Sequence, residues 1–393
     1  MDAARRLALG RLISLMGGSA AYIALIAAIY GHTGSAAWVS AALFAGVVGS
    51  VIGAPGAGYL GDRFDRKRVL IATDLASAAV AGTMAFFVDE PAALVALFGL
   101  LAVVTSPFAP ASAAAIPNLV GEERIARANS LVAATTSAGY LLGPLAGGLL
   151  LGVGVSTPVL FAADAASFVV SAVLVASLRR SFGRGGGTES HPGVLAGVRV
   201  IWRERVLRLL VAASMTSLLG IGIVNVAAYP LSLHLGGGTE GYGAMEALLG
   251  GGGLVGAALA GRLLTAGRAP AIVAVSFAVS SAGLGLAAGA PVLLAALAGM
   301  AVAGAGRGLG EVADTTLVQT RTDDAVRSRV FAAEEGAAHV AFSAAMLAGG
   351  LLVGVGGARL AVATAAGCAL LAALIASRMR PIREGQSTSS RAD

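Results

Sequence analysis

The sequence predicts an all-α integral membrane protein with twelve transmembrane helices in two pseudo-symmetric six-helix bundles. Of its 393 residues, 57% are hydrophobic and 12% are charged, whereas a soluble chain is about 25% charged. Apolar runs long enough to cross a bilayer recur along the chain. The basic residues fall almost entirely in alternate loops between these runs. A chain with so few charges cannot cover several soluble domains, so most of its surface must face lipid.

Twelve apolar runs have the length of a transmembrane helix. The seventh begins within a basic stretch, and the tenth carries charged residues. The runs cover residues 12–31, 38–60, 69–88, 92–115, 129–152, 157–178, 207–233, 243–264, 270–288, 291–318, 330–355 and 358–377. The Arg5-Arg6 pair followed by an apolar run could be read as a signal peptide. No convincing cleavage site ends that run, so we expect it to be an uncleaved first span.

The distribution of Lys and Arg predicts the orientation. All of the 27 basic residues except Arg307 and Arg359 fall at the N-terminus, in even-numbered loops or at the C-terminus. Short loops rich in these residues remain in the cytoplasm. Both termini are therefore expected on the cytoplasmic side.

The largest polar stretch divides the spans six and six. We expect an N-terminal bundle over 1–178, a cytoplasmic linker with an interfacial helix over 179–206, a C-terminal bundle over 207–380 and a disordered cytoplasmic tail over 381–393. An offset of 202 residues aligns Leu145–Leu150 with Leu347–Leu352, both LAGGLL, and indicates two parallel repeats.

Two residue counts exclude several kinds of site. Cys368 is the single cysteine, which excludes disulfides within the chain and Cys-based zinc or iron–sulfur sites. Lys67 is the single lysine, and its neighbours do not form a Walker A phosphate loop. The net charge of +6 lies in loops and not on a basic soluble face, so no nucleic-acid partner is expected. We expect no cofactor, no metal and no enzymatic activity.

A charged loop motif follows the second span, within Gly58–Leu70. It contains Gly58 and Asp62 with the cations Arg63, Arg66 and Lys67. A carboxylate at this position can accept hydrogen bonds from the N-terminus of a facing helix. The motif is therefore a candidate conformational-switch loop, and a plain positive-inside loop is the alternative.

A glycine motif lies in the fifth span. Gly139, Gly143 and Gly147 are four residues apart, and Pro144 and Gly148 lie among them. Glycines at this spacing give a helix a smooth face for close packing, and proline bends the helix. Simple helix packing is the alternative to a functional role.

Charged residues inside the spans are the proton-coupling candidates, because ionisable groups at membrane depth are costly. Arg307, Glu311 and Asp314 share one helix face in the tenth span. We expect Glu311 to pair with Arg307 and to take up a proton when that partner is removed; a static ion pair is the alternative. Glu334 and Glu335 follow early in the eleventh span, where they are either a proton relay or simply hydrated.

Three uncharged polar residues are candidates for a central substrate cavity. They are Tyr22, Asn225 and Tyr229. Packing or lipid-facing roles are alternatives for all three. Asp74 and Asp164 are single acids within spans, and Asp74 is expected at the membrane interface.

The loop motif resembles that of the major facilitator superfamily, Gly-x-Leu-Ala-Asp-Arg-x-Gly-Arg-Lys, and departs from it at Gly61 and Asp65. The glycine motif resembles the antiporter motif of the same superfamily. The segments Pro107–Ser130 and Gln319–Val330 resemble its enterobactin-exporter-like and drug:proton antiporter branch. Many exporters of the superfamily carry an Arg in the fourth span, and this chain lacks it. The offset of 202 residues between the repeats aligns Thr105 of the fourth span with Arg307 of the tenth.

The resemblance implies a secondary active transporter of the bacterial inner membrane. It would export a small amphipathic molecule, such as a drug, siderophore or other metabolite, by alternating access in exchange for protons. Its expected partners are the substrate, protons and the lipid bilayer, and the chain is expected to be a monomer. An importer or facilitator of the same fold is the first alternative. A non-transporting receptor or scaffold is the second, although no loop is long enough for a signalling domain.

Overall fold

The computed structural model describes residues 3–109, 111–112, 115–116, 125–178, 194–265, 267–322 and 324–379. Nearly all of them are helical, and none of them lies in a β-strand. They divide into two compact units, of which the first is built from the chain up to residue 189 together with 229–247. The second is built from residues 190–228 and from 248 onward. The predicted all-α class is confirmed.

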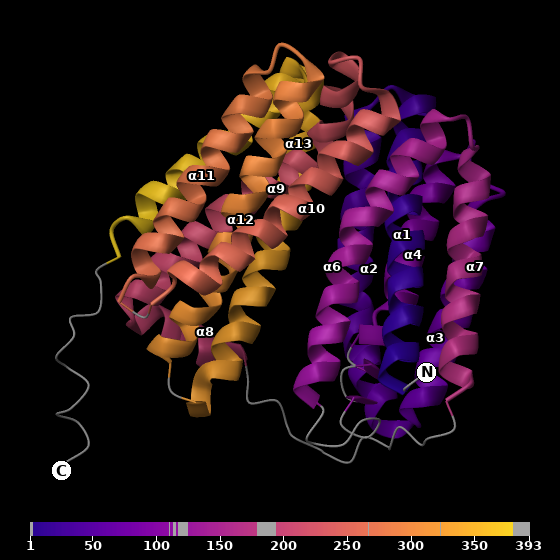
Figure 1. The fold of residues 1–393 in the computed structure, drawn as a ribbon, viewed down its shortest axis with the longest axis horizontal. Helices are drawn as coiled ribbons and strands as arrows, with labels where there is room; N and C mark the ends of the chain where they lie inside the picture. Colours follow the sequence, from indigo (N-terminus) through magenta and orange to yellow (C-terminus); the bar gives the residue numbers. More distant parts are fainter. Residues whose placement is uncertain are drawn as a thin grey trace. The chain divides into compact units, whose positions relative to one another are not determined.

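The first unit contains a helix for each of the first six predicted spans (Figure 1). The long helix α1 packs against α6 and α7, α2 packs against α4, and α3 packs against α7 and α4. Helix α4 ends at Thr105, ten residues before the predicted end of that span at 115. The bounds are α1 Ala3–Thr33, α2 Ala36–Arg63, α3 Arg66–Met84, α4 Pro91–Thr105, α6 Ile125–Gly152 and α7 Thr157–Ala176.

The second unit contains the remaining helices. Helix α11 packs against α12 and α13, and the short α8 packs against α13. The end of α9 and the start of α10, residues 229–247, group with the first unit. The bounds are α8 Val194–Arg203, α9 Arg205–His234, α10 Gly238–Leu263, α11 Ala269–Gly289, α12 Leu293–Arg321 and α13 Asp324–Ala376. Helix α8 coincides with the predicted interfacial helix.

Helix α13 contains both the eleventh and the twelfth predicted spans. They are separated at Gly357, whose φ of 76° lies in the left-handed region that favours glycine. Just beyond this kink, the Arg359 guanidinium donates to the carbonyl oxygens of Ala288 (3.1 Å) and Ala290 (2.7 Å) at the end of α11. The kink and this clamp explain why one hydrophobic stretch forms two spans.

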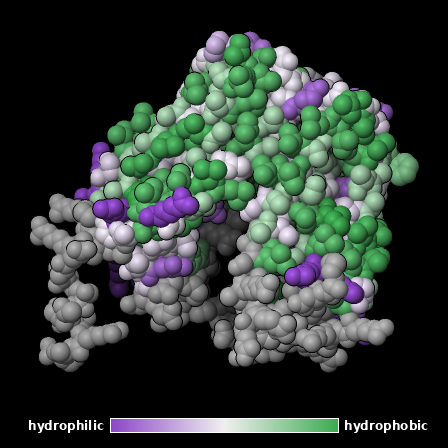
Figure 2. All heavy atoms as spheres, viewed as in Figure 1, coloured by the Kyte–Doolittle hydropathy of each residue, from purple (hydrophilic) through white to green (hydrophobic). Residues whose placement is uncertain are grey.

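The surface of the units is apolar. Eight helices in the described ranges are long and apolar enough to cross a membrane, counting α13 once. Large hydrophobic side chains are exposed on several of them, including Leu294, Val340 and Leu351, each at least 70% exposed. Figure 2 shows hydrophobic residues over most of the visible surface. This surface is what lipid-facing helices require and confirms the predicted membrane protein.

Glycine residues allow close contact between helices in the second unit. A Cβ added at Gly299 of α12 would lie 2.6 Å from the Gly283 oxygen and 2.7 Å from the Ala287 nitrogen of α11. Both atoms are backbone, so no side chain could move aside. By contrast, an added Cβ at Gly285 of α11 would meet nothing within 4 Å. Close packing of this kind drives helix association where no hydrophobic effect acts between helices.

Replacing Gly299 by Ala should therefore destabilise the protein, and the same change at Gly285 should not. The methyl group at 299 must push α11 and α12 apart, at a cost of about 1–3 kcal/mol. At Gly285 the methyl group only improves helix propensity, by about 0.5–1 kcal/mol. Thermal unfolding of the two purified variants in detergent checks the difference. Equal melting temperatures would contradict the close approach of these helices.

Candidate functional site

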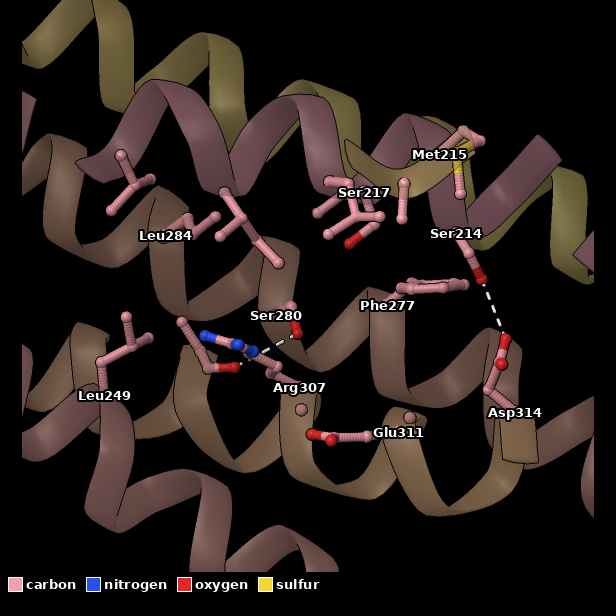
Figure 3. Close-up of a pocket in the computed structure, with 18 of the residues that line it drawn as sticks. Ser214, Met215, Ser217, Leu249, Phe277, Ser280, Leu284, Arg307, Glu311 and Asp314 are labelled. Carbon is pink, nitrogen blue, oxygen red and sulfur yellow. Dashed lines mark hydrogen bonds between the residues drawn. The ribbon is translucent and has the colours of Figure 1, made fainter. Parts of the chain in front are cut away.

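The second unit contains a cavity of about 280 Å³ between five helices (Figure 3). Most of its wall is apolar, and its polar groups come mainly from α9 and α12, with one each from α11 and α13. The apolar side chains are Met215, Leu218, Ile221, Val224, Leu249, Phe277, Leu284, Ala303, Ala338 and Ala369, and the polar ones are Ser214, Ser217, Ser280, Arg307, Glu311, Asp314, Thr315 and Glu334. An apolar pocket with a few convergent polar groups is the usual form of a ligand site.

Four ionisable residues line this cavity, and sequence analysis selected all four. Arg307, Glu311 and Asp314 lie on one face of α12, as their spacing predicts, and Glu334 joins them from α13. The side chain of the fifth candidate, Glu335, lies outside the part of the chain that the structure describes. The cavity therefore combines three carboxyl groups with one guanidinium.

Asp314 and Glu334 form a carboxyl pair. Their carboxyl groups lie close to each other, and the Ser214 hydroxyl of α9 donates to Asp314 Oδ1 at 2.9 Å. Figure 3 shows Asp314 directed toward Ser214. Two ionised carboxylates this close would repel each other, and one proton shared between them would relieve the repulsion.

The predicted ion pair between Arg307 and Glu311 is not formed in this structure. Both side chains line the cavity and are exposed, and the ion pairs of the described residues do not include them. Exposed charges one helical turn apart gain little from pairing in a hydrated environment, which explains the difference. The helix-face prediction was right, but the pairing prediction was wrong.

Glycines of α12 explain why these polar residues face the cavity. Added Cβ atoms at Gly306 and Gly310 would each lie 2.6 Å from atoms of Ser276 in α11, and one at Gly308 would collide with the Gly253 backbone of α10. Alternate glycines thus pack α12 against two neighbours. The face of α12 between these two contacts carries Arg307 and lines the cavity.

The switch-loop residues occupy the junction of α2 and α3. Arg63 is the last residue of α2, and Arg66 is the first of α3. The surroundings of Gly58 and the side chain of Asp62 lie outside the described set. Two contacts define the junction. Asp65 caps α3 by accepting from the Arg68 backbone N–H at 3.2 Å, and Lys67 Nζ donates to the Leu178 oxygen beyond α7 at 2.7 Å.

Sequence analysis missed the role of Asp65, although an Asp directly before a helix is a common N-cap. The aspartate replaces the glycine of the superfamily pattern and starts α3 with a side-chain hydrogen bond.

The glycine motif of α6 is packed on two sides, and its residues are buried. Gly139, Gly143 and Gly147 face α1; a Cβ at Gly143 would lie 2.5 Å from Ser19 Cβ. Gly148 instead faces the start of α10, where an added Cβ would lie 3.0 Å from Gly243 Cα, and the Pro144 carbonyl lies against the same glycine. The close packing predicted from the spacing is present, and it involves two partners within the first unit.

The tyrosine candidates belong to an aromatic cluster of the first unit. The Tyr229 ring packs 5.6 Å from that of Tyr30 and 5.4 Å from that of Tyr242, and Tyr22 lies 6.4 Å from Phe98 between ring centroids. Asn225 is half-buried on α9. These three candidates, Tyr22, Asn225 and Tyr229, are not among the residues that line the cavity of the second unit.

Two acids are buried in the first unit. Asp74 of α3 and Asp164 of α7 are each 1% exposed, so both are enclosed by neighbouring helices. Asp164 accepts from the Ser167 hydroxyl at 3.3 Å, and Asp74 lies beside Ser171. Contacts of α3 with α7 cover Asp74, whereas the Asp164 carboxylate faces Gly17 and Gly18 of α1. Spacing in the sequence alone does not reveal these contacts.

Comparison with known proteins relates the chain to membrane transporters. It is 29% identical over 174 residues to the macrolide efflux protein A of Streptococcus pyogenes, which is 43% of each chain. It is 30% identical over 203 residues to the multidrug efflux pump Tap of Mycolicibacterium fortuitum, which is 47% of this chain and 49% of that one. The chain thus matches less than half the length of either relative.

Solved structures share the fold over nearly the whole chain. The nucleoside transporter NupG superposes with a TM-score of 0.79 at 12% identity and covers 96% of this chain and 98% of its own. A D-xylose–proton symporter superposes with a TM-score of 0.70 at 17% identity and covers 96% and 98%. The model of the Major Facilitator Superfamily matches residues 7–333. The chain therefore belongs to the major facilitator superfamily and is a multi-pass membrane transporter.

Proposed function

We propose that this transporter exports a small amphipathic molecule, such as a drug, siderophore or other metabolite, by alternating access in exchange for protons. The cavity of the second unit carries the proposal, because it joins an apolar wall to the Asp314–Glu334 carboxyl pair. Two efflux proteins among the relatives support the direction of transport. Antiport requires one site that a proton and the substrate use in turn, and this pair suits that role.

The charges in the cavity favour a cationic substrate. Arg307 and Glu311 carry opposite charges, so the net charge depends on the pair Asp314–Glu334. With one shared proton the pair carries a single negative charge, and without it the pair carries two. Loss of the proton therefore strengthens the attraction for a cation, and binding of a cation opposes protonation. Reciprocal binding of this kind couples two ligands thermodynamically.

Two motifs of the first unit support the transport cycle in this proposal. The switch loop of Gly58, Asp62, Arg63, Arg66 and Lys67 would stabilise one of the two arrangements that alternating access requires. The α6 glycine motif, which resembles the antiporter motif, would allow helices to separate and return without interlocked side chains. The protein would lie in a bacterial inner membrane as a monomer with both termini cytoplasmic.

Glu334→Gln should uncouple transport from the proton gradient, whereas Glu311→Gln should not. Both variants lose one carboxylate of the same size in the same cavity, but only the first loses the carboxyl pair. In inside-out vesicles with an acidic interior, we expect roughly tenfold or greater loss of accumulation for Glu334→Gln and for Asp314→Asn. An amphipathic amine, chosen by its thermal stabilisation of the purified protein, serves as the transported probe.

Binding and exchange measurements separate loss of coupling from loss of folding. Glu334→Gln should still be stabilised by the amine and should still exchange it down a gradient. If only Glu311→Gln lost uphill transport, the coupling site would be Arg307 and Glu311 and not the carboxyl pair. Accumulation by the wild type without any pH gradient would favour a facilitator.

The proposed orientation predicts which loops a membrane-impermeant maleimide reaches in intact cells. In a Cys368→Ala background, Ser35→Cys lies between α1 and α2 and should react. Thr265→Cys, which lies between α10 and α11, should react only after the cells are permeabilised. Both positions lie outside the helices, so a reversed pattern would show the opposite orientation.

A further inference from the structure

Helix α8 is amphipathic and is fixed to the second unit by its apolar face. Ile201 is buried in a cluster that contains Val206 and Leu207 of α9 and Val330 of α13, and Val198 packs against the same cluster. The connection to α9 is also held, because the Arg208 guanidinium donates to the Trp202 carbonyl oxygen at 2.9 Å. The orientation of α8 is therefore defined, and so is the face that it turns outward.

The outward face of α8 is basic and aromatic. Arg199, Trp202 and Arg203 are exposed, and Arg205 adds a further exposed cation at the start of α9. We call these four residues the α8 basic face. Trp202 is 67% exposed, which is unusual for a side chain with such a large apolar area.

Among the described residues, acidic groups do not pair with the arginines of the α8 basic face. Glu204 is the one acidic residue between 194 and 238 in the sequence. Its carboxylate pairs with Arg321 of α12 at 3.5 Å and accepts from the Leu207 backbone N–H. Among the described residues, no carboxylate pairs with Arg199, Arg203 or Arg205. The described carboxylates therefore leave the positive charge of this face available to an external anion.

We propose that the α8 basic face binds the phosphate headgroups of anionic phospholipids. Its arginines supply donors for phosphate oxygens, and indole rings favour the headgroup level of a bilayer, where one edge is apolar and the other is hydrated. A soluble anion would satisfy the arginines but would leave Trp202 in water. A leaflet covers both kinds of group, and it already surrounds the helices to which α8 is attached.

Trp202 provides the measurement. The chain has two tryptophans, so Trp38→Phe leaves Trp202 as the only indole. This variant is reconstituted in mixtures of phosphatidylcholine and phosphatidylglycerol, with bromine near the headgroup on one lipid or on the other. At equal mole fractions, brominated phosphatidylglycerol should quench Trp202 fluorescence more strongly than brominated phosphatidylcholine. The preference should be roughly 10- to 30-fold weaker in Arg199→Gln/Arg203→Gln.

A second pair of exposed arginines gives the matched control. Arg262→Gln/Arg268→Gln removes the same charge from the α10–α11 connection and should keep the preference for phosphatidylglycerol. Equal quenching by both lipids, or an unchanged preference in Arg199→Gln/Arg203→Gln, would overturn the proposal. Absence of quenching by either lipid would show that this face meets water or a protein. A saturable change of Trp202 emission with inorganic phosphate in detergent would assign the site to a soluble anion instead.

Discussion

The close approach of helix backbones at glycine is the constraint on which the rest of this structure depends. Lipid is as apolar as the side chains it surrounds, so helices in a bilayer associate through contact and not through exclusion of water. Where Gly299 meets α11 and Gly308 meets α10, backbone lies against backbone. The same device holds Gly143 of α6 against α1. Contacts of this kind fix which residues of each helix remain available for other purposes.

Helix α12 shows how packing and chemistry share one element. Its glycines are used in contacts with α10 and α11, and Arg307, Glu311 and Asp314 lie on the face that lines the cavity. Arg307 and Glu311 are exposed there, while Asp314 accepts a hydrogen bond from Ser214 of α9 and lies close to Glu334 of α13. The two carboxyl groups thus come from different helices, and the distance between them depends on how α13 packs against α12.

The sequence was sufficient for the fold and for part of the site. Length, apolar runs and the separation of Arg residues predicted the helices, because the bilayer imposes simple rules on length and charge. The helical spacing of Arg307, Glu311 and Asp314 predicted their common face. The contact between Asp314 and Glu334 depends on how α12 and α13 pack, and no local pattern reports such packing. For the same reason the sequence wrongly paired Arg307 with Glu311, which are neighbours only along one helix.

The burial of Asp74 was missed for a related reason. A single acid near one end of a span is usually hydrated, and only the contacts of α3 with α7 exclude water from it. The positions of Tyr22 and Tyr229 also depend on tertiary contacts, since their aromatic partners come from other helices. Interactions between residues close in the sequence were predictable, whereas contacts between residues of different helices were not.

The bond from Lys67 to the end of α7 has a practical consequence. Lys67 is the only lysine side chain, so acylating reagents that select lysine side chains have one target in the whole protein. That target donates to the Leu178 carbonyl, and acylation would remove its charge and its bond to α7 together. The rate of its modification therefore reports how often this one contact opens, and a fluorophore placed there by ordinary amine chemistry would observe the α3–α7 junction without any engineered cysteine.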